Sequence, residues 1–501
     1  MNLIDRIKLH AAHNPDQVAI SWPEGDCVYA GLLSLVNSAI QLLEEAEIEI
    51  LALDIDNGPA WVALDIAALQ LGICLIPLPP FFSAGQLQHI LRQSGAEAVV
   101  TDNPVRLLQR TGSLLLDGQI KFNLEEHQLF WMKTAPDPVH QKASIPAGVH
   151  KITYTSGTTG EPKGVMLSWT QMLAVAESLA NAVGLNGDDR HLVLMPLAVL
   201  LENIGGVYAS LWGGASLVLL PLAQTGLSGS SGIDGKRMIQ ALQQSGATTA
   251  IFTPQTLQSV LEVLERNSDL SLMLRFAAVG GAPVSSRLLQ RASAIGLPVY
   301  EGYGLSECAS VVTLNTPAGC RPGSVGRPLP HIHLDISENG EVLIKGTPFV
   351  GYLGDPKPTD VLWPTGDLGV LDNDGFLYLR GRSRNLFITA FGRNIAPEWI
   401  ERELTLEPEI AQAAVFGEAR PYNVAVVVPK IGFSSSDIEA ALVRANRSLP
   451  DYARVSGWIP ADAPFSTGNN LLTGTGRIRR KLIAEQYGAK IDLLYRRNQT
   501  I

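Results

Sequence analysis

A loop rich in glycine and hydroxyl groups follows a short apolar segment in the first third of the 501-residue chain. Residues 153–164 contain three glycines, several threonines and Lys163. Glycine admits backbone angles closed to other residues, so consecutive N–H groups can converge on an anion, while hydroxyls and a lysine add donors. Placed after the strand expected at 151–154, the loop predicts a polyphosphate site at the edge of a sheet. A solvated turn is the plainer alternative.

The spacing of this loop separates it from the phosphate loop of common nucleotide hydrolases. Its pattern is Gly-x-x-Gly-x-x-Lys-Gly, beginning at Gly157, whereas those hydrolases use Gly-x-x-x-x-Gly-Lys-Ser/Thr. A hydrolase of that class is therefore disfavoured, and a different phosphate-binding loop is expected.

Composition indicates a globular protein of two or more domains, because 501 residues exceed what one hydrophobic core usually holds. Hydrophobic residues make up 46% and charged residues 17%, which excludes disorder caused by low hydrophobicity. A net charge of −10 disfavours nucleic acid as the main partner. Any anionic ligand must therefore be held by local groups.

The cysteines and the apolar segments favour a cytoplasmic protein. The four cysteines are scattered without zinc-ligand or disulfide spacing, which is typical of reduced thiols. The first residues lack the pattern of a secretion signal, and the apolar runs at 191–201 and 209–223 are shorter than a bilayer span. No transmembrane helix is predicted, although an apolar substrate could still bring the protein to a membrane surface.

The first half of the chain alternates short apolar strands with helices. Strands are expected at 49–54 and 74–77, with a helix at about 60–71 between them, which predicts parallel β-α-β units. The segments 280–283 and 302–307 also follow expected strands. Because the carboxyl ends of parallel strands meet at one edge of a sheet, these two loops should share a rim.

The alternation continues after the glycine-rich loop and then changes. A helix is expected between Ser168, a capping residue, and Gly184, whose missing Cβ suits a C-terminal cap. After about residue 310, short strands and glycine turns predict hairpins. The basic run 380–385 predicts an exposed linker to a C-terminal α+β domain.

Several motifs together resemble the adenylate-forming superfamily, which includes acyl-CoA synthetases, luciferases and peptide-synthetase adenylation domains. Residues 153–164 resemble its signature loop, and residues 301–307 resemble its Tyr-Gly-x-Thr-Glu element with Ser306 in place of threonine. Asp367, in a Thr-Gly-Asp turn, and Arg382, in a Gly-Arg pair, follow in the family's order. Within the superfamily, the chain is most similar to the long-chain fatty acyl-CoA synthetases.

The resemblance implies an α/β and α+β fold of two parts. Residues 1–384 would form a large N-terminal domain with doubly wound, mixed or parallel sheets, a small β-barrel-like part, the ATP site and the acyl pocket. Residues 385–501 would form a small, mobile C-terminal α+β domain. Asn385 lies at the position of the family's hinge, and Gly392 lies where backbone borders the channel for the thiol.

The same resemblance implies roles for named residues. The implied catalytic residues are Thr155, Lys163, Glu307 and Arg477, with Glu307 also holding Mg²⁺, a cation that prefers carboxylate and phosphate oxygens. The implied nucleotide-binding residues are Ser156, Gly157, Thr158, Thr159, Gly160, Gly280, Gly281, Ala282, Pro283, Gly302, Tyr303, Gly304, Ser306, Asp367 and Arg382. Tyr303 would stack on adenine, and Asp367 would accept hydrogen bonds from two ribose hydroxyls.

Arg477 departs from the family pattern, which has a lysine at this position for the adenylation step. Arginine keeps the cation but is bulkier and forked, so it does not simply replace lysine. A protein that binds a nucleotide or acyl-AMP but adenylates weakly is therefore an alternative.

The segment 195–206 resembles the family element that borders the acyl pocket. Val199, Leu200, Gly205 and Gly304 are the expected pocket residues, and Val199 lies where many relatives carry a ring. Amino-acid-activating relatives place an aspartate near this region, and none occurs at 195–201. An apolar acid is therefore favoured, with a fatty acid preferred and an aryl acid as the alternative.

The sequence thus predicts an AMP-forming acid–thiol ligase that uses ATP and Mg²⁺ and transfers an acyl group to CoA or to a phosphopantetheine. No carrier domain is evident, so an acyl carrier protein would act in trans. The substrate would be a small-molecule carboxylic acid.

Overall fold

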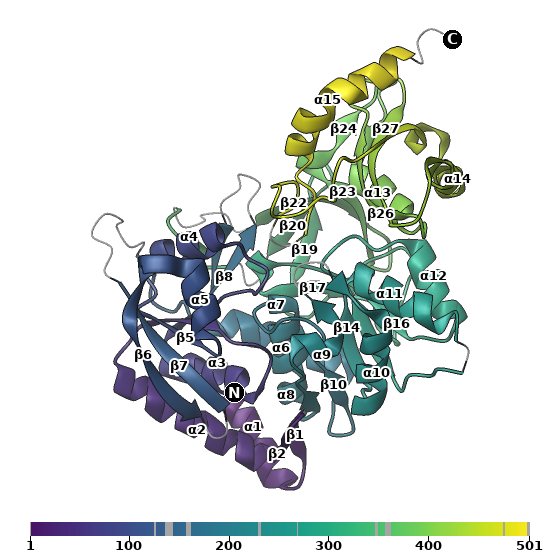
Figure 1. The fold of residues 1–501 in the computed structure, drawn as a ribbon. Coiled ribbons are helices and arrows are strands. Elements are labelled where there is room, and N and C mark those ends of the chain that lie inside the picture. Colours follow the sequence, from purple (N-terminus) through teal and green to yellow (C-terminus); the bar gives the residue numbers. More distant parts are fainter. Residues whose placement is uncertain are drawn as a thin grey trace.

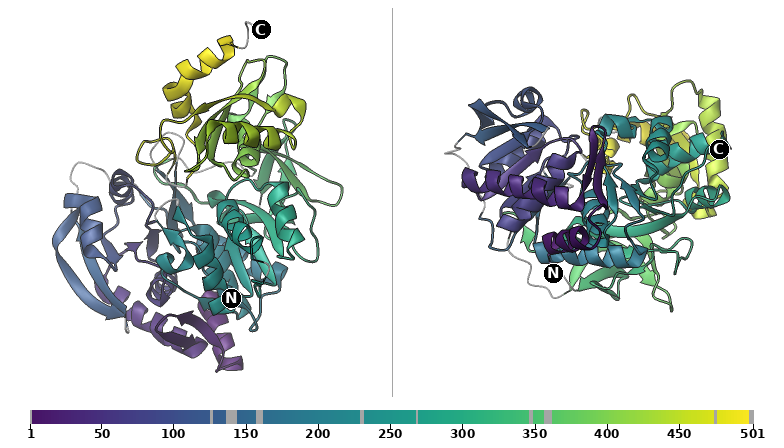
Figure 2. Two further views of the ribbon diagram at one scale, coloured as in Figure 1. Left: turned by 45° about the vertical axis from the view of Figure 1, so that its right-hand side comes forward. Right: turned by 90° about the horizontal axis from the view of Figure 1, so that it is seen from below.

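The computed structural model of the chain describes residues 2–124, 127–135, 144–156, 162–228, 232–267, 269–345, 349–355, 362–473 and 476–497. A large body contains the first three quarters of the chain, and a smaller C-terminal part stands at one end of it (Figures 1 and 2). The two largest sheets lie in the large body, with helices between and outside them.

The first large sheet has eight strands in the order β21-β9-β8-β4-β3-β5-β7-β6. Strands β3, β4, β5 and β8 run parallel, and β9, β7 and β6 pair antiparallel at the two sides. The strands are β3 (Ile50–Asp54), β4 (Cys74–Pro77), β5 (Ala98–Thr101), β6 (Leu115–Leu124), β7 (His127–Thr134), β8 (Lys151–Ser156), β9 (Pro162–Leu167) and β21 (Gly351–Tyr352). The predicted parallel unit at 49–77 is confirmed.

The second large sheet has nine strands in the order β18-β17-β16-β15-β14-β10-β11-β1-β2. Its centre is parallel, and an antiparallel pairing closes each end. The strands are β1 (Val18–Trp22), β2 (Gly25–Val28), β10 (Arg190–Leu192), β11 (Ser216–Val218), β14 (Thr249–Phe252), β15 (Phe276–Val279), β16 (Val299–Leu305), β17 (Ser310–Leu314) and β18 (Arg327–Pro328).

The helices of the large body follow the sequence signals at their ends. Helix α3 (Pro59–Leu71) begins with proline and ends at Gly72, which has a φ of +74°. Helix α6 (Trp169–Val183) begins after Ser168, whose side chain accepts from the N–H of Gln171, and ends at Gly184 with a φ of +65°. Both helices match the predictions, and both contribute to a core that also contains side chains of the two large sheets.

The remaining helices of the large body cover the sheets or connect their strands. They are α1 (Leu3–His13), α2 (Tyr29–Ala46), α4 (Ala84–Ser94), α5 (Pro104–Thr111), α7 (Leu200–Glu202), α8 (Ala209–Gly213), α9 (Leu222–Thr225), α10 (Gly235–Ser245), α11 (Pro254–Leu264) and α12 (Ser286–Ala294). A π-helical turn, η2 (Asn203–Tyr208), continues α7 directly into α8.

A smaller antiparallel sheet of β19 (His333–Ile336), β20 (Glu341–Lys345), β22 (Trp363–Leu371) and β23 (Leu377–Arg382) forms the hairpin-rich part. Its apolar side chains pack with those of β17. The turn η4 (Ser383–Asn385) follows β23 and leads into the C-terminal part.

The C-terminal part is an α+β unit with its own cores. A three-stranded sheet of β26 (Ile410–Phe416), β27 (Asn423–Pro429) and β28 (Val455–Pro460) packs against α13 (Pro397–Thr405), α14 (Ser435–Asn446) and α15 (Arg480–Arg497). A short hairpin of β24 (Phe387–Ile388) and β25 (Asn394–Ile395) precedes α13. The predicted fold class, α/β and α+β with mixed sheets, is confirmed.

None of the helices in the described ranges combines the length and the apolar character that crossing a bilayer requires.

Candidate active site

The loop after β15 meets strand β16 at the rim of the nine-stranded sheet. A Cβ added to Gly280 would lie 3.1 Å from the carbonyl oxygen of Gly302, so the two backbones are in contact. Gly281 has a φ of +80°, which a residue with a side chain rarely adopts. Ala282 and Pro283 continue this loop and are partly or fully exposed. Gly280 lies beside Gly302, as predicted, but residues 302–305 belong to β16 and not to a loop, because they pair with β17.

Gly304 allows an unusually close backbone approach on this rim. A Cβ at Gly304 would overlap the carbonyl oxygen of Ser310 on the neighbouring strand β17. Ala309 and Ser310 have φ values of 53° and 111°, in the left-handed region that is costly for residues with a Cβ. The short turn η3 (Ser306–Cys308), which carries Ser306 and Glu307, is therefore held in a strained connection.

Three predicted nucleotide-binding residues form one chain of polar contacts. The hydroxyl of Tyr303 donates to Oδ2 of Asp367 at 2.7 Å, and Nε of Arg382 lies 2.7 Å from Oδ1. Burial raises the pKa of Asp367, and Arg382 and Tyr303 oppose this effect. Each carboxylate oxygen still has a free lone pair for a ligand hydroxyl. Strand pairing sets this geometry, because Asp367 on β22 lies opposite Arg382 on β23.

Glu307 is oriented by two neighbours. The hydroxyl of Tyr352 donates to Oε1 of Glu307 at 2.6 Å, and the side chain of Gln171 donates to its carbonyl at 2.9 Å. Burial and the Glu307 carboxylate raise the pKa of Tyr352 above its usual range, so Tyr352 stays a donor. The carboxylate keeps a second oxygen for a metal ion.

Lys163 lies on β9, next to Tyr352. Its ammonium is 3.4 Å from Oδ2 of Asp355 and 5.1 Å from the centre of the Tyr352 ring. Both members of the ion pair are about half exposed, so the pair holds the lysine weakly. Lys163 can therefore turn toward a ligand at little cost.

Arg477 reaches this site from the C-terminal part. Its guanidinium interacts electrostatically with Arg382, Asp367, Glu307 and Arg384, all on the large body or the connection to it. Desolvation and Arg382 lower the pKa of Arg477, against the attraction of Asp367 and Glu307. The side chain is exposed, and its electrostatic partners include predicted catalytic and nucleotide-binding groups, so the C-terminal part lies close to the site in this arrangement.

The central loop of the predicted phosphate site lies outside the described residues. This applies to Gly157, Thr158, Thr159 and Gly160, and to the side chain of Ser156. Strands β8 and β9 pair up to Ser156 and Pro162, and Thr155 lies opposite Lys163. The ends of the loop are therefore fixed side by side at the edge of the sheet.

The predicted acyl-pocket residues differ in their burial. Leu200 is buried in the core, whereas Val199 and Gly205 are only partly buried. A Cβ at Gly205 would touch Leu201, Leu179 and Ile251 at 3.5–3.7 Å. Leu201 also lies 3.7 Å from the Cβ position of Gly281. Leu201, which the sequence did not single out, therefore lies between the predicted pocket and the nucleotide rim.

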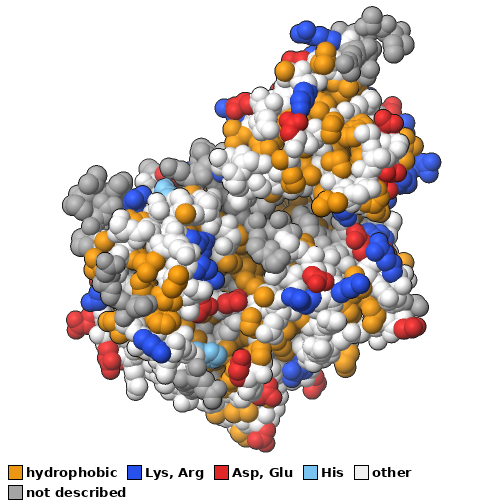
Figure 3. All heavy atoms as spheres, in the orientation of Figure 1, with side chains coloured by type: hydrophobic (Ala, Val, Ile, Leu, Met, Phe, Trp, Pro, Cys, Tyr) orange, Lys and Arg blue, Asp and Glu red, His pale blue; other side chains and the backbone are white. Residues whose placement is uncertain are grey.

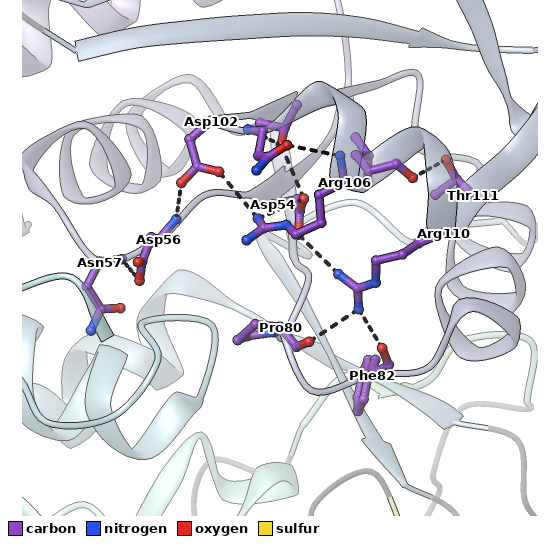
Figure 4. Close-up of polar contacts among 12 residues, drawn as sticks. Asp54, Asp56, Asn57, Pro80, Phe82, Asp102, Arg106, Arg110 and Thr111 are labelled. Carbon is purple, nitrogen blue, oxygen red and sulfur yellow. Dashed lines mark hydrogen bonds and ion pairs between the residues drawn. The ribbon is translucent and has the colours of Figure 1, made fainter. Parts of the chain in front are cut away.

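The turn at Asp56 and Asn57 joins this segment to the rim of the eight-stranded sheet (Figure 4). The side-chain amide of Asn57 donates to the carbonyl of Met195 at 2.9 Å and accepts from the N–H of Leu197 at 2.9 Å. The N–H of Asp56 donates to Asp102 at 2.7 Å. Buried Asp54 pairs with Arg106 and Arg110, which close the same rim (Figure 4).

The predicted hinge and thiol-channel residues lie in the connection and the first hairpin of the C-terminal part. Asn385 donates a side-chain hydrogen bond to Glu398 on α13. Gly392 has a φ of +72° in the exposed turn between β24 and β25, and its neighbour Phe391 is 74% exposed. The roles predicted for Asn385 and Gly392 stay predictions.

Helix α13 docks the C-terminal part on the large body. Ser285 donates to Glu403 at 2.8 Å, and Arg402 donates to the carbonyl of Val284 at 2.8 Å. Arg287 bridges to Glu407, and Leu406 packs into the apolar core of α11 and α12. The docking surface directly follows the loop that holds Gly280 and Gly281.

Glu301, buried beside this docking surface, makes stability depend on pH. Burial raises its pKa from 4.5 to about 8, although Arg402 opposes the shift. Between about pH 4.5 and pH 8 the folded protein holds a proton that the unfolded chain has lost, so stability falls as pH rises. Because glutamine stays neutral, Glu301→Gln should flatten this part of the profile, as measured by thermal unfolding. If the stability of the wild type and of the variant changes with pH in the same way, Glu301 is not the group responsible.

The residues present fit a nucleotide with a magnesium ion. The described ranges contain no group of three His, Cys, Asp or Glu side chains that could hold a metal by itself. Magnesium at phosphate-transfer sites uses one or two carboxylates together with phosphates and water, and Glu307 can supply one. Acidic and basic side chains are interspersed on the face in Figure 3, so the cations of the site itself must attract the anion.

Comparison with known proteins identifies the family. Residues 7–353 match the model for AMP-binding enzymes, and residues 385–499 match the model for the C-terminal domain of AMP-binding enzymes. The chain belongs to the AMP-binding enzyme family, and the predicted class, an AMP-forming acid–thiol ligase, is confirmed.

Individual relatives cover most of the chain. A long-chain-fatty-acid–CoA ligase of Mycobacterium bovis is 28% identical over 87% of this chain and 86% of that protein. A 2-succinylbenzoate–CoA ligase of Bacillus pumilus is 29% identical over 82% of this chain and 84% of that protein. The crystal structure of an anthranilate CoA ligase with anthranoyl-AMP has the same fold, with a TM-score of 0.80, 19% identity and coverage of 97% of each chain.

Proposed function

We propose that the protein activates an apolar carboxylic acid with ATP and then transfers the acyl group to a phosphopantetheine thiol. In the first step an acid oxygen attacks the α-phosphorus, the bond to the β-phosphate breaks, and pyrophosphate leaves. In the second step the thiolate sulfur attacks the acyl carbon, and AMP leaves. The observation that carries the proposal is the contact of Asp367 with both Tyr303 and Arg382, which brings three expected nucleotide-binding residues together.

Each residue has a role that its contacts support. Asp367, oriented by Tyr303 and Arg382, accepts hydrogen bonds from the ribose hydroxyls. Glu307 holds the magnesium ion, which neutralises phosphate charge when bound. Arg477 donates to the negative charge that develops between the acid and the α-phosphate, and Lys163 turns toward the outer phosphates. The rest of the catalysis is positioning of the reacting atoms.

The apolar wall supports a fatty acid as the substrate. Leu201, Ile251 and Leu179 surround Gly205, and the segment 195–201 has no acidic residue that could pair with an amine. The relatives include ligases named for a fatty acid and for the aryl acid succinylbenzoate. An aryl acid is therefore the second candidate.

The acceptor is CoA or the phosphopantetheine of a carrier protein acting in trans. We place the hinge at Asn385, between η4 and β24, so that residues 1–384 and 385–501 move as two domains. The exposed turn at Phe391 and Gly392 would enter the site when the C-terminal domain turns. Arg477 would leave the site in the same motion.

Pyrophosphate release tests the proposal directly. Purified protein is given ATP, magnesium and a panel of fatty, aryl and amino acids, with and without CoA. Release with fatty or aryl acids, and thioester formation on addition of CoA, are expected. No release with any acid would refute the adenylation step, and would leave a nucleotide-binding protein as the better description.

Gly205 should limit the length of the acid. In Gly205→Leu the added side chain would occupy the space beside Leu201 and Ile251, so kcat/KM for long acids should fall by about tenfold or more relative to short acids. Gly205→Ala is the control, because its Cβ makes only ordinary contacts and should change little. An unchanged preference in Gly205→Leu would place the acyl chain elsewhere.

A further inference from the structure

A lysine and an aspartate form a fully buried ion pair in the large body. Lys151, the first residue of β8, has a side chain that is 1% exposed, and Asp65 on α3 is 2% exposed. The ammonium lies 2.7 Å from Oδ1 of Asp65. Asp65 is the single charged residue in α3, whose residues 59–68 are buried without interruption. Burying charged groups costs free energy. We therefore expect a further group of the protein to interact with this pair.

The partner is the π-helical turn η2. The ammonium of Lys151 donates to Oδ1 of Asn203 at 2.5 Å, and the amide of Asn203 donates to Oδ2 of Asp65 at 2.8 Å. The three side chains thus close a ring. Lys151 also lies 3.4 Å from the hydroxyl of Tyr208 and 5.1 Å from the centre of its ring. Asn203 and Tyr208 are the first and last residues of η2.

Contact with both ends of η2 depends on its π-helical form. A π-helix has hydrogen bonds between residues five apart, so its first and sixth residues come near one face. In a regular α-helix, five steps turn the chain through about 500°, which leaves those side chains roughly 140° apart. Lys151 could not reach both Asn203 and Tyr208 in that case. The buried pair therefore stabilises the π-helical form against the α-helical one.

A second polar cluster fixes the start of the turn from the other sheet. Oε1 of Glu202 lies 2.9 Å from Nε2 of His191 on β10, and Oε2 accepts from the N–H of Met195 at 3.0 Å. A Cβ at Gly206 would lie within 2.6 Å of His191, so only glycine fits there. Since the start of η2 is held, the loss of Lys151 would act on the residues after Asn203.

The turn carries part of the proposed acid pocket. Gly205 lies in the middle of η2 and faces Leu201, Leu179 and Ile251. Conversion of η2 to a regular α-helix would rotate each later residue about the helix axis by about 100°, which is the angle between successive residues of an α-helix. Gly205 would then no longer face Leu201, and Ile204 or Gly206 would move toward that space.

We infer that Lys151 is a positioning residue for acid specificity, which acts by holding η2 in the π-helical form through Asp65, Asn203 and Tyr208. The inference rests on the proposed function, because that proposal assigns Gly205 to the acid pocket. Lys151 acts through η2 and contacts neither the acid nor ATP. It therefore sets which acids fit rather than how the α-phosphate reacts.

The test removes both charges together, so that neither is left buried and unpaired. Lys151→Met/Asp65→Leu in the full-length protein is assayed for pyrophosphate release with straight-chain acids from short to long. The ratio of kcat/KM between long and short acids should change by about tenfold or more, with the KM for ATP unchanged. Lys490→Met, which breaks an exposed pair with Asp462 in the C-terminal part, is the control and should keep the wild-type profile.

A crystal structure of the double variant gives a readout that does not need activity. A regular α-helix at residues 203–208 is expected. A retained π-helical turn, or a folded double variant with the wild-type acid profile, overturns the inference. If the wild type releases no pyrophosphate with any acid, the proposed function fails, and the structure of the variant still decides whether the buried pair holds η2.

Discussion

Replacing Arg477 with alanine is expected to slow pyrophosphate release by about 10²–10³-fold, the loss seen when a donor to a developing anion is removed. Arg477 is the cation of the C-terminal part that interacts electrostatically with Asp367 and Glu307. Transfer from added acyl-AMP to CoA should be affected much less, because Arg477 leaves the site in the proposed second step. The two rates are measured separately, as pyrophosphate release and as thioester formation from synthetic acyl-AMP.

Two further variants sharpen this result. Arg447→Ala removes an exposed cation of the same part of the protein and should leave both rates unchanged. Arg477→Lys restores the residue type found in the family and is expected to raise the first rate. A lower first rate in Arg477→Lys would show that arginine is the adapted residue, and equal losses of both rates in Arg477→Ala would contradict a role limited to adenylation.

Replacing Lys151 alone with methionine is expected to destabilise the protein by about 3–5 kcal/mol, because Asp65 would be left as an uncompensated buried charge. The free energy of unfolding of the large body, measured in urea, checks this value. Addition of Asp65→Leu should recover most of the loss, since replacement of a buried pair by apolar residues is often neutral. The single variant Lys490→Met should cost less than about 1 kcal/mol, as is usual for exposed pairs. Equal losses of unfolding free energy in Lys151→Met and Lys490→Met would contradict the importance of burial.

The parallel units and their helix ends could be predicted because their signals are local. Proline at the start of α3, Ser168 before α6 and glycines at both C-terminal ends each act within a few residues. The rim formed by Gly280 and Gly302 followed from strand order alone. These features depend on neighbours in sequence or on a general rule of sheet topology.

The buried ring of Lys151, Asp65 and Asn203 could not be predicted in the same way. The three residues come from a strand, a helix and a turn that are far apart in the sequence, and each alone is compatible with an exposed position. The π-helical turn has no local signature, since residues 203–208 would also fit an α-helix. Tertiary contacts with both sheets decide its form.

The candidate site was predicted residue by residue, but not its internal contacts. Asp367 and Arg382 were each expected near the nucleotide, whereas their ion pair depends on the register of β22 and β23. Leu200 was expected in the acid pocket and is buried in the core, and the neighbouring Leu201 lies beside Gly205 and Gly281. A shift by one residue turns a helical side chain by about 100°, which sequence patterns do not resolve.

The docking of α13 on the large body bears on how often the enzyme can complete a catalytic cycle. Leu406, Ser285 and Arg287 hold the C-terminal part in the arrangement that brings Arg477 to the site. If that part turns between the two chemical steps, every cycle must release these contacts and form them again. The free energy of these docking contacts then sets the fraction of time that the enzyme spends in the ATP-competent and in the thiol-competent arrangement. It thereby sets the maximum turnover rate.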